Sequence, residues 1–420
     1  MVKQQERPHI VIVGAGFGGI RAATLLAKEN VEVTLIDKQN YHLFQPLLYQ
    51  VATAGLSEKD IVCPVRTIFR SQNNLDFRMD EVLTVDFVNK QLMTKTAQIK
   101  YDYLLLATGS TTNFFGLSSV AQNAFGIKTL GGSVRLRNQI IRMFELASHE
   151  EDEIKRHALL TFIVVGGGPT GVEFSGALSE LIHMILAKEY HSLNFKEVRI
   201  VLVEASDGLL PGMEADLQEA TVDALIRKKV EVRLLAQVSD FDGKTLVLKG
   251  EERIPTHTVI WAAGVCATSL MDGLNAEQDR ARRVVVNDYL HLPGGPEVFV
   301  IGDAAHFRQD GEPLPMVAPV AVQQADTAVG NILSLIGQTP MKPFHYNSVG
   351  KMATVGRNFA VLHIGGFKSK GFVAWLIWSM VHVLRLVHFR NRTVVFMKWV
   401  WEYLTYERIE HVISQDDEAK

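Results

Sequence analysis

The chain has 420 residues, 47% hydrophobic and 21% charged, which is the composition of a globular protein with two or three domains. The net charge of −3 argues against nucleic-acid binding along the whole chain, because phosphate binding needs a basic surplus. The only cysteines, Cys63 and Cys266, exclude a disulfide scaffold, a CxxC redox pair and a cysteine-rich metal site. We expect no metal and a reduced, intracellular setting, and the polar start of the chain contains no apolar signal-peptide core.

The first predicted strand, His9–Val13, leads directly into a glycine-rich turn and a helix. In this context the GxGxxG pattern is typical of dinucleotide binding. Gly14 permits a tight turn, Gly16 lets a pyrophosphate approach the backbone, and Gly19 lets the helix pack on the strand. The phosphates would meet the positive helix N-terminus, while Asp37, at the end of the next strand, would bind a ribose. The alternative is an ordinary strand-to-helix turn.

The same layout recurs 152 residues later, which predicts a second copy of the same domain type. A strand over residues 159–165 runs into Gly166, Gly168 and Gly171, and the next strand ends in Glu204. Glu204 lies 33 residues beyond Gly171, farther than the usual spacing of about 20, so we expect a long helix and an insertion between them. No base follows Glu204 in the next three residues, which favours NAD over NADP.

Further strand-like runs end in Gly109, Gly264 and Gly302, and strand–turn–helix alternation is typical of doubly wound α/β folds. We therefore predict two Rossmann-like domains. Two dinucleotide sites in one chain have an economical chemical reason, namely hydride transfer from a nicotinamide to a flavin. Asp303, which follows Gly302, suits a flavin ribityl chain, although a solvated turn aspartate is the alternative.

The sequence resembles a family of two-dinucleotide-binding-domain flavoproteins, the type II NADH dehydrogenases, which are single-subunit, non-proton-pumping NADH:quinone oxidoreductases. The segments that carry this resemblance span nearly the whole chain: Ile12–Gly19, Asn40–Tyr49, Val164–Glu173, Ile301–Asp303, Leu314–Gln324 and Phe389–Arg392. The glycine turns alone would fit many other reductases, whereas the stretch that ends at Tyr49 and the aromatic, basic C-terminal region are specific.

The resemblance implies non-covalent FAD in a domain made from residues 1–118 and 290–366, an NADH domain over 119–289, and a membrane-association segment over 367–420. The implied FAD contacts are Gly14, Ala15, Gly16, Phe17, Gly18, Gly19, Asp37, Lys38, Val82, Thr108, Gly109, Asp303 and Ala321. The implied NADH contacts are Gly166, Gly168, Gly171, Glu173, Glu204 and Gly264.

The resemblance also makes Glu173 the catalytic candidate, at the place where nicotinamide meets flavin. From the residues alone, Glu173 opens a helix whose N-terminus favours an anion, and that helix-start role is the alternative. The family's quinone side points to Tyr49, Pro319, Gln323, Lys351 and Met352. Pro319 stands where many members have Gln, and Lys351 could equally be a surface lysine.

Other flavoproteins share this architecture. A sulfide:quinone reductase or a glutathione-reductase-like enzyme needs a redox-active cysteine pair, which Cys63 and Cys266 do not supply. A soluble ferredoxin-type reductase and a flavin-bound NADH sensor stay open as alternatives.

The apolar run Gly371–Leu384 would span about 21 Å as a helix, too short for the ~30 Å of bilayer hydrocarbon. We predict two amphipathic helices lying on the membrane, separated by a turn at Phe389–Arg392. The first would present an apolar face made of Phe372, Trp375, Leu376, Ser379, Val383 and Leu386. Peripheral binding at the cytoplasmic face of the inner (plasma) membrane follows. We also expect a homodimer: a dimer interface is the alternative use of this face, and both uses can hold at once. A polar tail, 414–420, is expected to be disordered.

Overall fold

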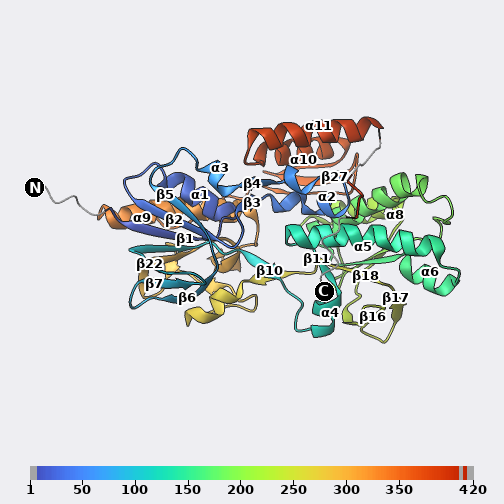
Figure 1. Ribbon diagram of the computed structural model, residues 1–420, viewed down its shortest axis with the longest axis horizontal. Helices are drawn as coiled ribbons and strands as arrows, with labels where there is room; N and C mark the ends of the chain where they lie inside the picture. Colours follow the sequence, from blue (N-terminus) through green and yellow to red (C-terminus); the bar gives the residue numbers. More distant parts are fainter. Residues whose placement is uncertain (1–6, 406–409, 414–420) are drawn as a thin grey trace, which may run out of the picture. The chain divides into compact units, whose positions relative to one another are not determined.

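The structure is a computed structural model, and it describes residues 7–405 and 410–413 (Figure 1). The chain forms two compact units. The first takes the chain up to Leu43, then Val62–Thr111 and Val265–Ser348; the second takes Phe44–Ile61, Thr112–Gly264 and the chain from Val349. The domains predicted from the sequence, 1–118 with 290–366, 119–289 and 367–420, are defined by the ligand or membrane that each part binds. The compact units are defined by contacts within the protein, so these predicted domains stay a prediction. The predicted disordered tail, 414–420, lies outside the described residues.

The first unit is built on a six-stranded sheet that is parallel apart from one edge strand. In spatial order its strands are β21 (His291–Leu292), β22 (Gly295–Val300), β9 (Tyr103–Leu106), β1 (His9–Val13), β2 (Glu32–Asp37) and β5 (Leu75–Met79). Helices α1 (Phe17–Leu26) and α9 (Ala318–Ile336) pack against each other on one side of it (Figure 1). The antiparallel strands β6 (Val82–Asp86), β7 (Gln91–Thr94) and β8 (Gln98–Lys100) lie on the other side.

Smaller elements complete the first unit. They are the helix α3 (Val65–Ile68) and the strand pairs β3 (Tyr41–Leu43) with β4 (Val62–Pro64), β20 (Val284–Val285) with β23 (Ala305–His306), and β24 (Arg308–Gln309) with β25 (Glu312–Pro313).

The second unit is built on a five-stranded parallel sheet. Its spatial order is β11 (Phe125–Gly126), β18 (Thr258–Trp261), β12 (Thr161–Val165), β13 (Arg199–Val203) and β14 (Val230–Arg233). Helix α5 (Leu130–His149) packs against β11 and β18, whereas α7 (Pro169–Glu180) packs against β12, β13 and β14 and against α8 (Ala215–Arg227). Short helices α2 (Leu48–Ala52), α4 (Ser118–Asn123) and α6 (Glu153–Leu159) and the antiparallel strands β15 (Val238–Phe241), β16 (Thr245–Leu248) and β17 (Arg253–Pro255) surround them.

Each unit therefore pairs a parallel sheet with a three-stranded antiparallel sheet, and the prediction of two Rossmann-like domains is confirmed. The central strands β1 and β12 are apolar along nearly their whole length because helices or strands cover both of their faces. The predicted insertion after the second glycine turn is helical only at its start. Beyond α7 the chain continues through a π-helical turn, Leu181–Ile185, and a 3₁₀ turn, Leu186–Lys188, before it reaches β13.

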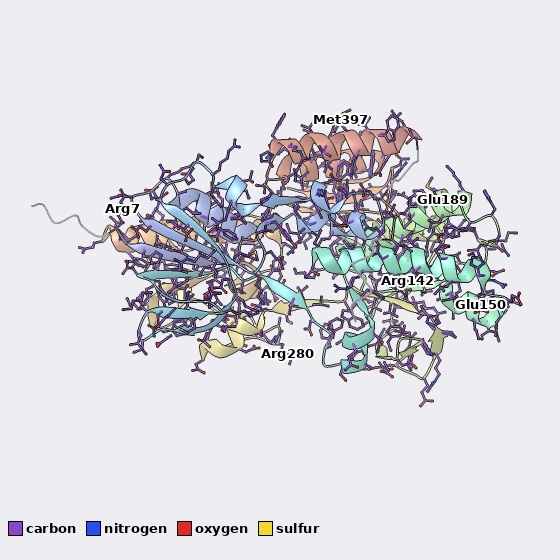
Figure 2. All side chains as sticks on the ribbon, in the orientation of Figure 1. Arg7, Arg142, Glu150, Glu189, Arg280 and Met397 are labelled. Carbon is purple, nitrogen blue, oxygen red and sulfur yellow. The ribbon has the colours of Figure 1, made fainter. Side chains whose placement is uncertain are left out.

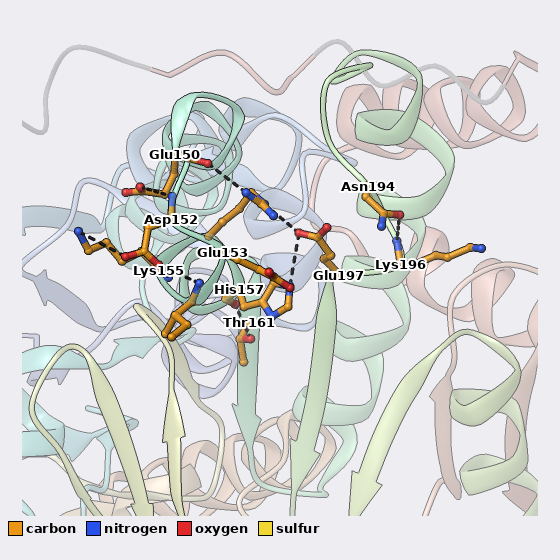
Figure 3. A network of polar contacts seen from close by, with 11 residues as sticks. Glu150, Asp152, Glu153, Lys155, His157, Thr161, Asn194, Lys196 and Glu197 are labelled. Atoms are coloured by element: carbon orange, nitrogen blue, oxygen red, sulfur yellow. Dashed lines mark hydrogen bonds and ion pairs between the residues drawn. The ribbon is translucent and has the colours of Figure 1, made fainter.

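A polar network fastens the amino ends of β12 and β13, at the sheet edge opposite the glycine turn (Figure 3). Arg156 of α6 donates from Nε to Glu197 at 2.9 Å and from Nη1 to the carbonyl of Glu150 at 3.2 Å. The His157 imidazole lies 3.5 Å from the same Glu197 carboxylate, and the Thr161 hydroxyl donates to the His157 carbonyl at 2.7 Å. Because the strands are parallel, all their carboxyl ends lie at the opposite edge of the sheet. That edge carries the glycine turn and is not occupied by this network.

The C-terminal part consists of the antiparallel strands β26 (Lys351–Thr354), β27 (Ala360–Ile364) and β28 (Phe367–Gly371), followed by helices α10 (Phe372–Arg385) and α11 (Phe389–Thr405). Helix α10 packs on this sheet and against α11 (Figure 1). Two helices were predicted, but the turn at Phe389–Arg392 is wrong, because these residues form the start of α11. The chain turns earlier, where Leu386 is extended and its carbonyl accepts a 2.7 Å hydrogen bond from Arg392 Nε.

The predicted apolar face of α10 is also partly wrong. The large exposed apolar side chains of this helix and the following turn are Phe372, Val373, Leu376, Met380, Leu384 and Val387, whereas Ala374, Trp378 and Leu386 are buried. The apolar face is therefore rotated, because the helix is apolar nearly all round and tertiary packing decides which side is covered. Helix α11 adds Phe389, Phe396, Met397, Val400, Trp401 and Leu404, and Figure 2 labels Met397 there. Among the described residues, no helix is both long enough and apolar enough to cross a membrane.

Candidate active site

The first glycine turn brings the backbone of β1 and α1 into close approach. Gly14 has φ +107°, and a Cβ built there would lie 2.3 Å from the Ala107 carbonyl oxygen. A Cβ on Gly19 would lie 1.7 Å from the Gly14 carbonyl oxygen. A Cβ on Gly16 would meet nothing within 4 Å, so open space remains above the turn at the N-cap of α1. This is the space that a pyrophosphate needs at a helix N-terminus.

The second turn repeats this geometry. Gly166 has φ +113°, and its Cβ would lie 2.6 Å from the backbone of Ala262 and Ala263. A Cβ on Gly171 would lie 1.9 Å from the Gly166 carbonyl oxygen, whereas a Cβ on Gly168 would meet nothing within 4 Å. In both turns, therefore, a Cβ on the first or the last glycine of the motif would clash with backbone, whereas a Cβ on the middle glycine would point into open space.

The acid at the end of the next strand reaches back to the turn in both units. Asp37 Oδ2 accepts from the Ala15 amide at 2.6 Å, and Glu204 Oε2 accepts from the Gly167 amide at 2.5 Å. The long sequence gap before Glu204 does not displace it. These acids lie where a ribose would follow a pyrophosphate bound at the turn, which fits their predicted role.

The two acids differ in proton affinity. Burial raises the pKa of Asp37, and hydrogen bonds from the Ala15 and Gln39 amides only partly oppose it. Burial also acts to raise the pKa of Glu204, but backbone bonds from Ser206 and Gly167 and the Ser206 hydroxyl outweigh it and lower that pKa. Glu204 is therefore held as an anion.

The remaining predicted FAD contacts belong to the first unit. Lys38 forms an ion pair with Glu81 at 2.6 Å, and the Thr108 hydroxyl lies 3.0 Å from that of Thr268. The Ser110 hydroxyl donates to Asp303. Val82 is the first residue of β6, and Phe17 is the first residue of α1. Gly109 has a positive φ. A Cβ on Gly18 would lie 3.2 Å from the carbonyl oxygen of Ala321. These residues and the open Gly16 turn fit a dinucleotide.

Gly264, the last predicted NADH contact, belongs to the second unit. Its carbonyl accepts from the Asn113 amide at 3.0 Å, and a Cβ on Gly264 would lie 2.9 Å from the Phe115 ring.

Glu173 lies in the second turn of α7 and is only 8% exposed. The first turn of α7 contains no acidic residue, so the helix-start role does not describe its position. Its Oε1 accepts from the Trp378 indole Nε1 at 3.0 Å and from the Thr354 amide at 3.3 Å. Both donors are uncharged. They come from α10 and β26, two elements that follow Glu173 in the chain by more than 180 residues.

Burial raises the pKa of Glu173 to about 8, although the bonds from Thr354 and Trp378 act to lower it. At neutral pH the side chain is therefore mostly a neutral acid that can give up a proton. The folded state binds this proton more tightly than the unfolded chain does. The stability that Glu173 contributes is therefore complete at low pH and is lost as the pH rises toward about 8.

A narrow cleft of about 60 Å³ lies beside this acid, within the second unit. Its walls come from α2, α7, β26 and both C-terminal helices: Tyr49, Gln50, Gly55, Ala177, Glu180, Thr354, Gly356, Arg357, Trp375, Trp378, Ser379, Trp399, Glu402 and Tyr403.

The five predicted quinone residues fall in both units. Tyr49 is buried in the second unit and lines the cleft. Lys351 and Met352 precede Thr354 on β26, and the Lys351 ammonium donates to the Gly212 carbonyl at 2.8 Å. Pro319 and Gln323 lie on α9 in the first unit, where the Gln323 amide bonds the backbone of Asn347 in both directions at 2.9 Å.

Sequence reasoning missed several partners of the site. Trp378 and Thr354 hold Glu173, and Gln324 accepts from the Gly302 amide at 2.7 Å beside Asp303. Local sequence patterns carry no signal for these contacts, because each partner is distant in the chain.

Two glycine turns, each with a strand-end acid, define an oxidoreductase with two dinucleotide-binding domains. The model of the pyridine nucleotide-disulphide oxidoreductases matches residues 8–325, and that of the NDH2 C-terminal domain matches residues 349–406. The chain belongs to the type II NADH:quinone oxidoreductases.

Individual relatives agree. Two type II NADH:quinone oxidoreductases of Mycobacterium tuberculosis, Ndh and NdhA, are 37% and 39% identical to this chain. Each comparison covers 97% of this chain, and 91% and 90% of the relative. Among solved structures, NDH2 from Plasmodium falciparum in complex with NADH has the same fold, with a TM-score of 0.88 at 20% identity over 96% of this chain and 100% of that one. Sulfide:quinone oxidoreductase from Aquifex aeolicus has a TM-score of 0.74 at 17% identity, over 95% and 96%.

The open and crowded glycines of the first turn predict opposite outcomes for the same substitution. Gly16→Ala should fold with nearly wild-type stability but bind FAD about tenfold more weakly, because the new methyl group enters the space for the pyrophosphate. Gly19→Ala should destabilise the fold itself, since its Cβ would clash with the Gly14 carbonyl. Flavin absorbance per chain and thermal unfolding of the same samples measure both effects. Wild-type FAD affinity in Gly16→Ala would contradict this assignment.

Proposed function

We propose that the chain oxidises NADH, with non-covalently bound FAD as its cofactor, and reduces a membrane quinone without pumping protons. The balanced reaction consumes NADH, one proton and a quinone and yields NAD⁺ and a quinol. FAD, when bound, supplies a two-electron carrier that can accept a hydride and pass electrons to a quinone.

The observation that carries this proposal is the pair of matching turns in two separate sheets. We assign the first turn to resident FAD and the second to exchanging NADH, with the predicted contacts given above as their binding residues. Cys63 and Cys266 are both free and buried, so the chain offers no redox-active cysteine pair for the electrons. A quinone that accepts electrons directly from the flavin fits this composition.

We assign Glu173 as the proton donor and positioning group of the reaction. Its burial keeps it protonated at neutral pH, as a general acid requires. For the quinone itself we retain the five predicted contacts, Tyr49, Pro319, Gln323, Lys351 and Met352.

Stopped-flow spectroscopy tests this function. NADH should bleach the flavin of the wild-type protein, and a quinone should restore its absorbance; bleaching without restoration would indicate a sensor instead. In Glu173→Gln the quinone-dependent step should slow at least tenfold while FAD stays bound. The wild-type rate should fall as the pH rises through about 8, because the acid loses its proton, and the variant should lack this limb. Wild-type turnover of Glu173→Gln with quinone would contradict its role.

The preference for NADH over NADPH is assigned to Glu204. Its carboxylate accepts two hydrogen bonds from Ser206 at 2.8 Å and one from the Gly167 amide, and it is held ionised. An anion at this point would bind a ribose hydroxyl and repel a 2′-phosphate.

Glu204→Gln should therefore raise the KM for NADH roughly ten- to a hundredfold, the equivalent of ~1.5–3 kcal/mol for a bond to a charged group. It should also narrow the gap between NADH and NADPH. Glu219→Gln removes an exposed carboxylate from α8 in the same unit and serves as the charge-matched control. If both variants keep the wild-type ratio of NADH to NADPH, another acid reads the ribose.

Membrane attachment is assigned to the exposed apolar side chains of α10 and α11. Leu376, Met380 and Leu404 are 48%, 66% and 72% exposed, and such a face suits the lipid interface. Arg385 and Arg390, also exposed, flank it with basic groups that suit anionic lipids of the cytoplasmic leaflet. We therefore place the enzyme at the cytoplasmic face of the inner (plasma) membrane. A homodimer through the same aromatic region is the other use of this face.

The double variant Met380→Glu/Leu404→Glu should leave vesicles and reduce long-chain quinone slowly, yet oxidise NADH with a water-soluble acceptor at the wild-type rate. Ile154→Glu is the control, because Ile154 is 77% exposed on α6, away from this face. Vesicle sedimentation and light scattering measure binding and oligomeric state. If the double variant still binds vesicles but becomes monomeric, the face is a dimer contact and the membrane assignment is wrong.

A further inference from the structure

Trp378 is the residue through which the C-terminal helices reach Glu173. Its indole Nε1 donates to Glu173 Oε1 at 3.0 Å, and the Thr354 amide donates to the same oxygen at 3.3 Å. The other oxygen, Oε2, accepts no hydrogen bond from any residue that the structure describes. The two oxygens of one carboxyl group are therefore unequal.

The indole is held in place from several sides. Trp378 is 2% exposed and stacks on His382 with ring centroids 4.0 Å apart, and on Trp399 at 5.8 Å. The ring centroid of Tyr49 lies 6.4 Å from that of Trp378, and His382 Nδ1 lies 2.8 Å from the Trp378 carbonyl oxygen, at hydrogen-bond distance. A side chain packed in this way presents its N–H in one direction at little entropic cost.

A protonated carboxyl group has one O–H, and it places the proton on the oxygen that is not already accepting bonds. In Glu173 both N–H donors occupy Oε1, which leaves Oε2 for the proton. We propose that Trp378 is a positioning residue for the reaction: its indole fixes Oε1 of Glu173, so that the acid carries and exchanges its proton at Oε2. This inference rests on the proposed role of Glu173 as the proton donor.

The bond also affects the charge of the acid. A hydrogen bond to the ionised form stabilises that form, so Trp378 opposes the effect of burial on the pKa of Glu173. No ion pair to Glu173 is found among the described residues, so uncharged donors carry this effect. The titratable and charged groups that line the cleft beside Glu173 are Tyr49, Glu180, Arg357, Glu402 and Tyr403. Glu180 pairs with Lys228. Lys351 on β26 and His382 and Arg385 on α10 complete the set on the neighbouring elements.

A purely structural reading has to be separated from this one, because a buried indole N–H needs some partner. In that reading Glu173 satisfies the indole, and loss of the N–H changes only stability. In the positioning reading, loss of the N–H also changes the proton equilibrium of Glu173.

Trp378→Phe removes the N–H and keeps an aromatic ring in the stack. Infrared difference spectra of the protonated carboxyl band, recorded on the FAD-loaded protein over a pH series, give the titration of Glu173, and Glu173→Gln identifies its band. In Trp378→Phe the midpoint should rise by about one to two pH units above the wild-type value, the equivalent of one hydrogen bond to a charged group. The pH above which quinone reduction falls should shift in the same direction.

Trp399→Phe is the matched control. Its indole also donates within this cluster, to Gln50 Oε1 at 2.8 Å, but it does not touch Glu173. It should leave the Glu173 midpoint unchanged. An unchanged midpoint in Trp378→Phe, or an equal shift in both variants, overturns the proposal.

A second measurement avoids the risk that Trp378→Phe does not fold. In wild-type protein with ¹⁵N-labelled tryptophan, one indole resonance should titrate with the midpoint of Glu173 and stop titrating in Glu173→Gln. If no indole resonance follows Glu173, the proposal is wrong, whatever the turnover. If an indole does follow Glu173 but Glu173→Gln turns over normally, the positioning contact stands and the proposed catalytic role of Glu173 is the part that fails.

Discussion

The structure depends on two places where backbone passes so close to backbone that a side chain cannot fit. Gly14 lies against the end of β9 and Gly166 against the end of β18, each with a positive φ. The helix after each turn, α1 in one unit and α7 in the other, then follows its strand directly, and a second glycine lets that helix lie on the turn. The helix N-terminus is consequently exposed at the carboxyl edge of a parallel sheet, with an acid from the next strand beside it. The open space and the exposed amides that a pyrophosphate would need follow from this close approach.

Helix α7 connects the second glycine turn with the C-terminal elements. It begins at the second glycine turn, and its next turn carries Glu173. Farther along, Gly176 approaches the backbone of Val355 and Gly356 so closely that its Cβ would lie 2.6 Å from an amide nitrogen, and Glu180 accepts from the Arg357 amide at 2.5 Å. One helix thus presents the second glycine turn at its start and a buried acidic face to β26 and α10. The helix that carries the exposed apolar face therefore touches the candidate acid directly, through Trp378.

The contrast between Glu204 and Glu173 shows how donors decide the charge of a buried acid. Both lose solvation. Glu204 accepts bonds at both oxygens from backbone and hydroxyl donors of a loop, and its pKa falls below the ordinary value. Glu173 receives two donors on one oxygen, deeper in the protein, and its pKa rises to about 8. The lowered pKa of Glu204 fits its proposed role in binding a ribose, which requires a fixed anion. The raised pKa of Glu173 fits its proposed role in proton transfer, which requires an acid that can change its charge near neutral pH.

The sequence by itself determined the two Rossmann-like units, the positions of both glycine turns, and Asp37 and Glu204 as their acids. These features are local: a strand, a turn and a helix are adjacent in the chain, and their glycines are required by backbone geometry. Only the tertiary structure decided the surroundings of Glu173, because Thr354 and Trp378 are 181 and 205 residues away. It also decided which side of α10 is exposed and that the chain turns before Phe389. A helix that is apolar nearly all round has no preferred face of its own, so the sheet beneath it and Trp378 on Glu173 select the buried side.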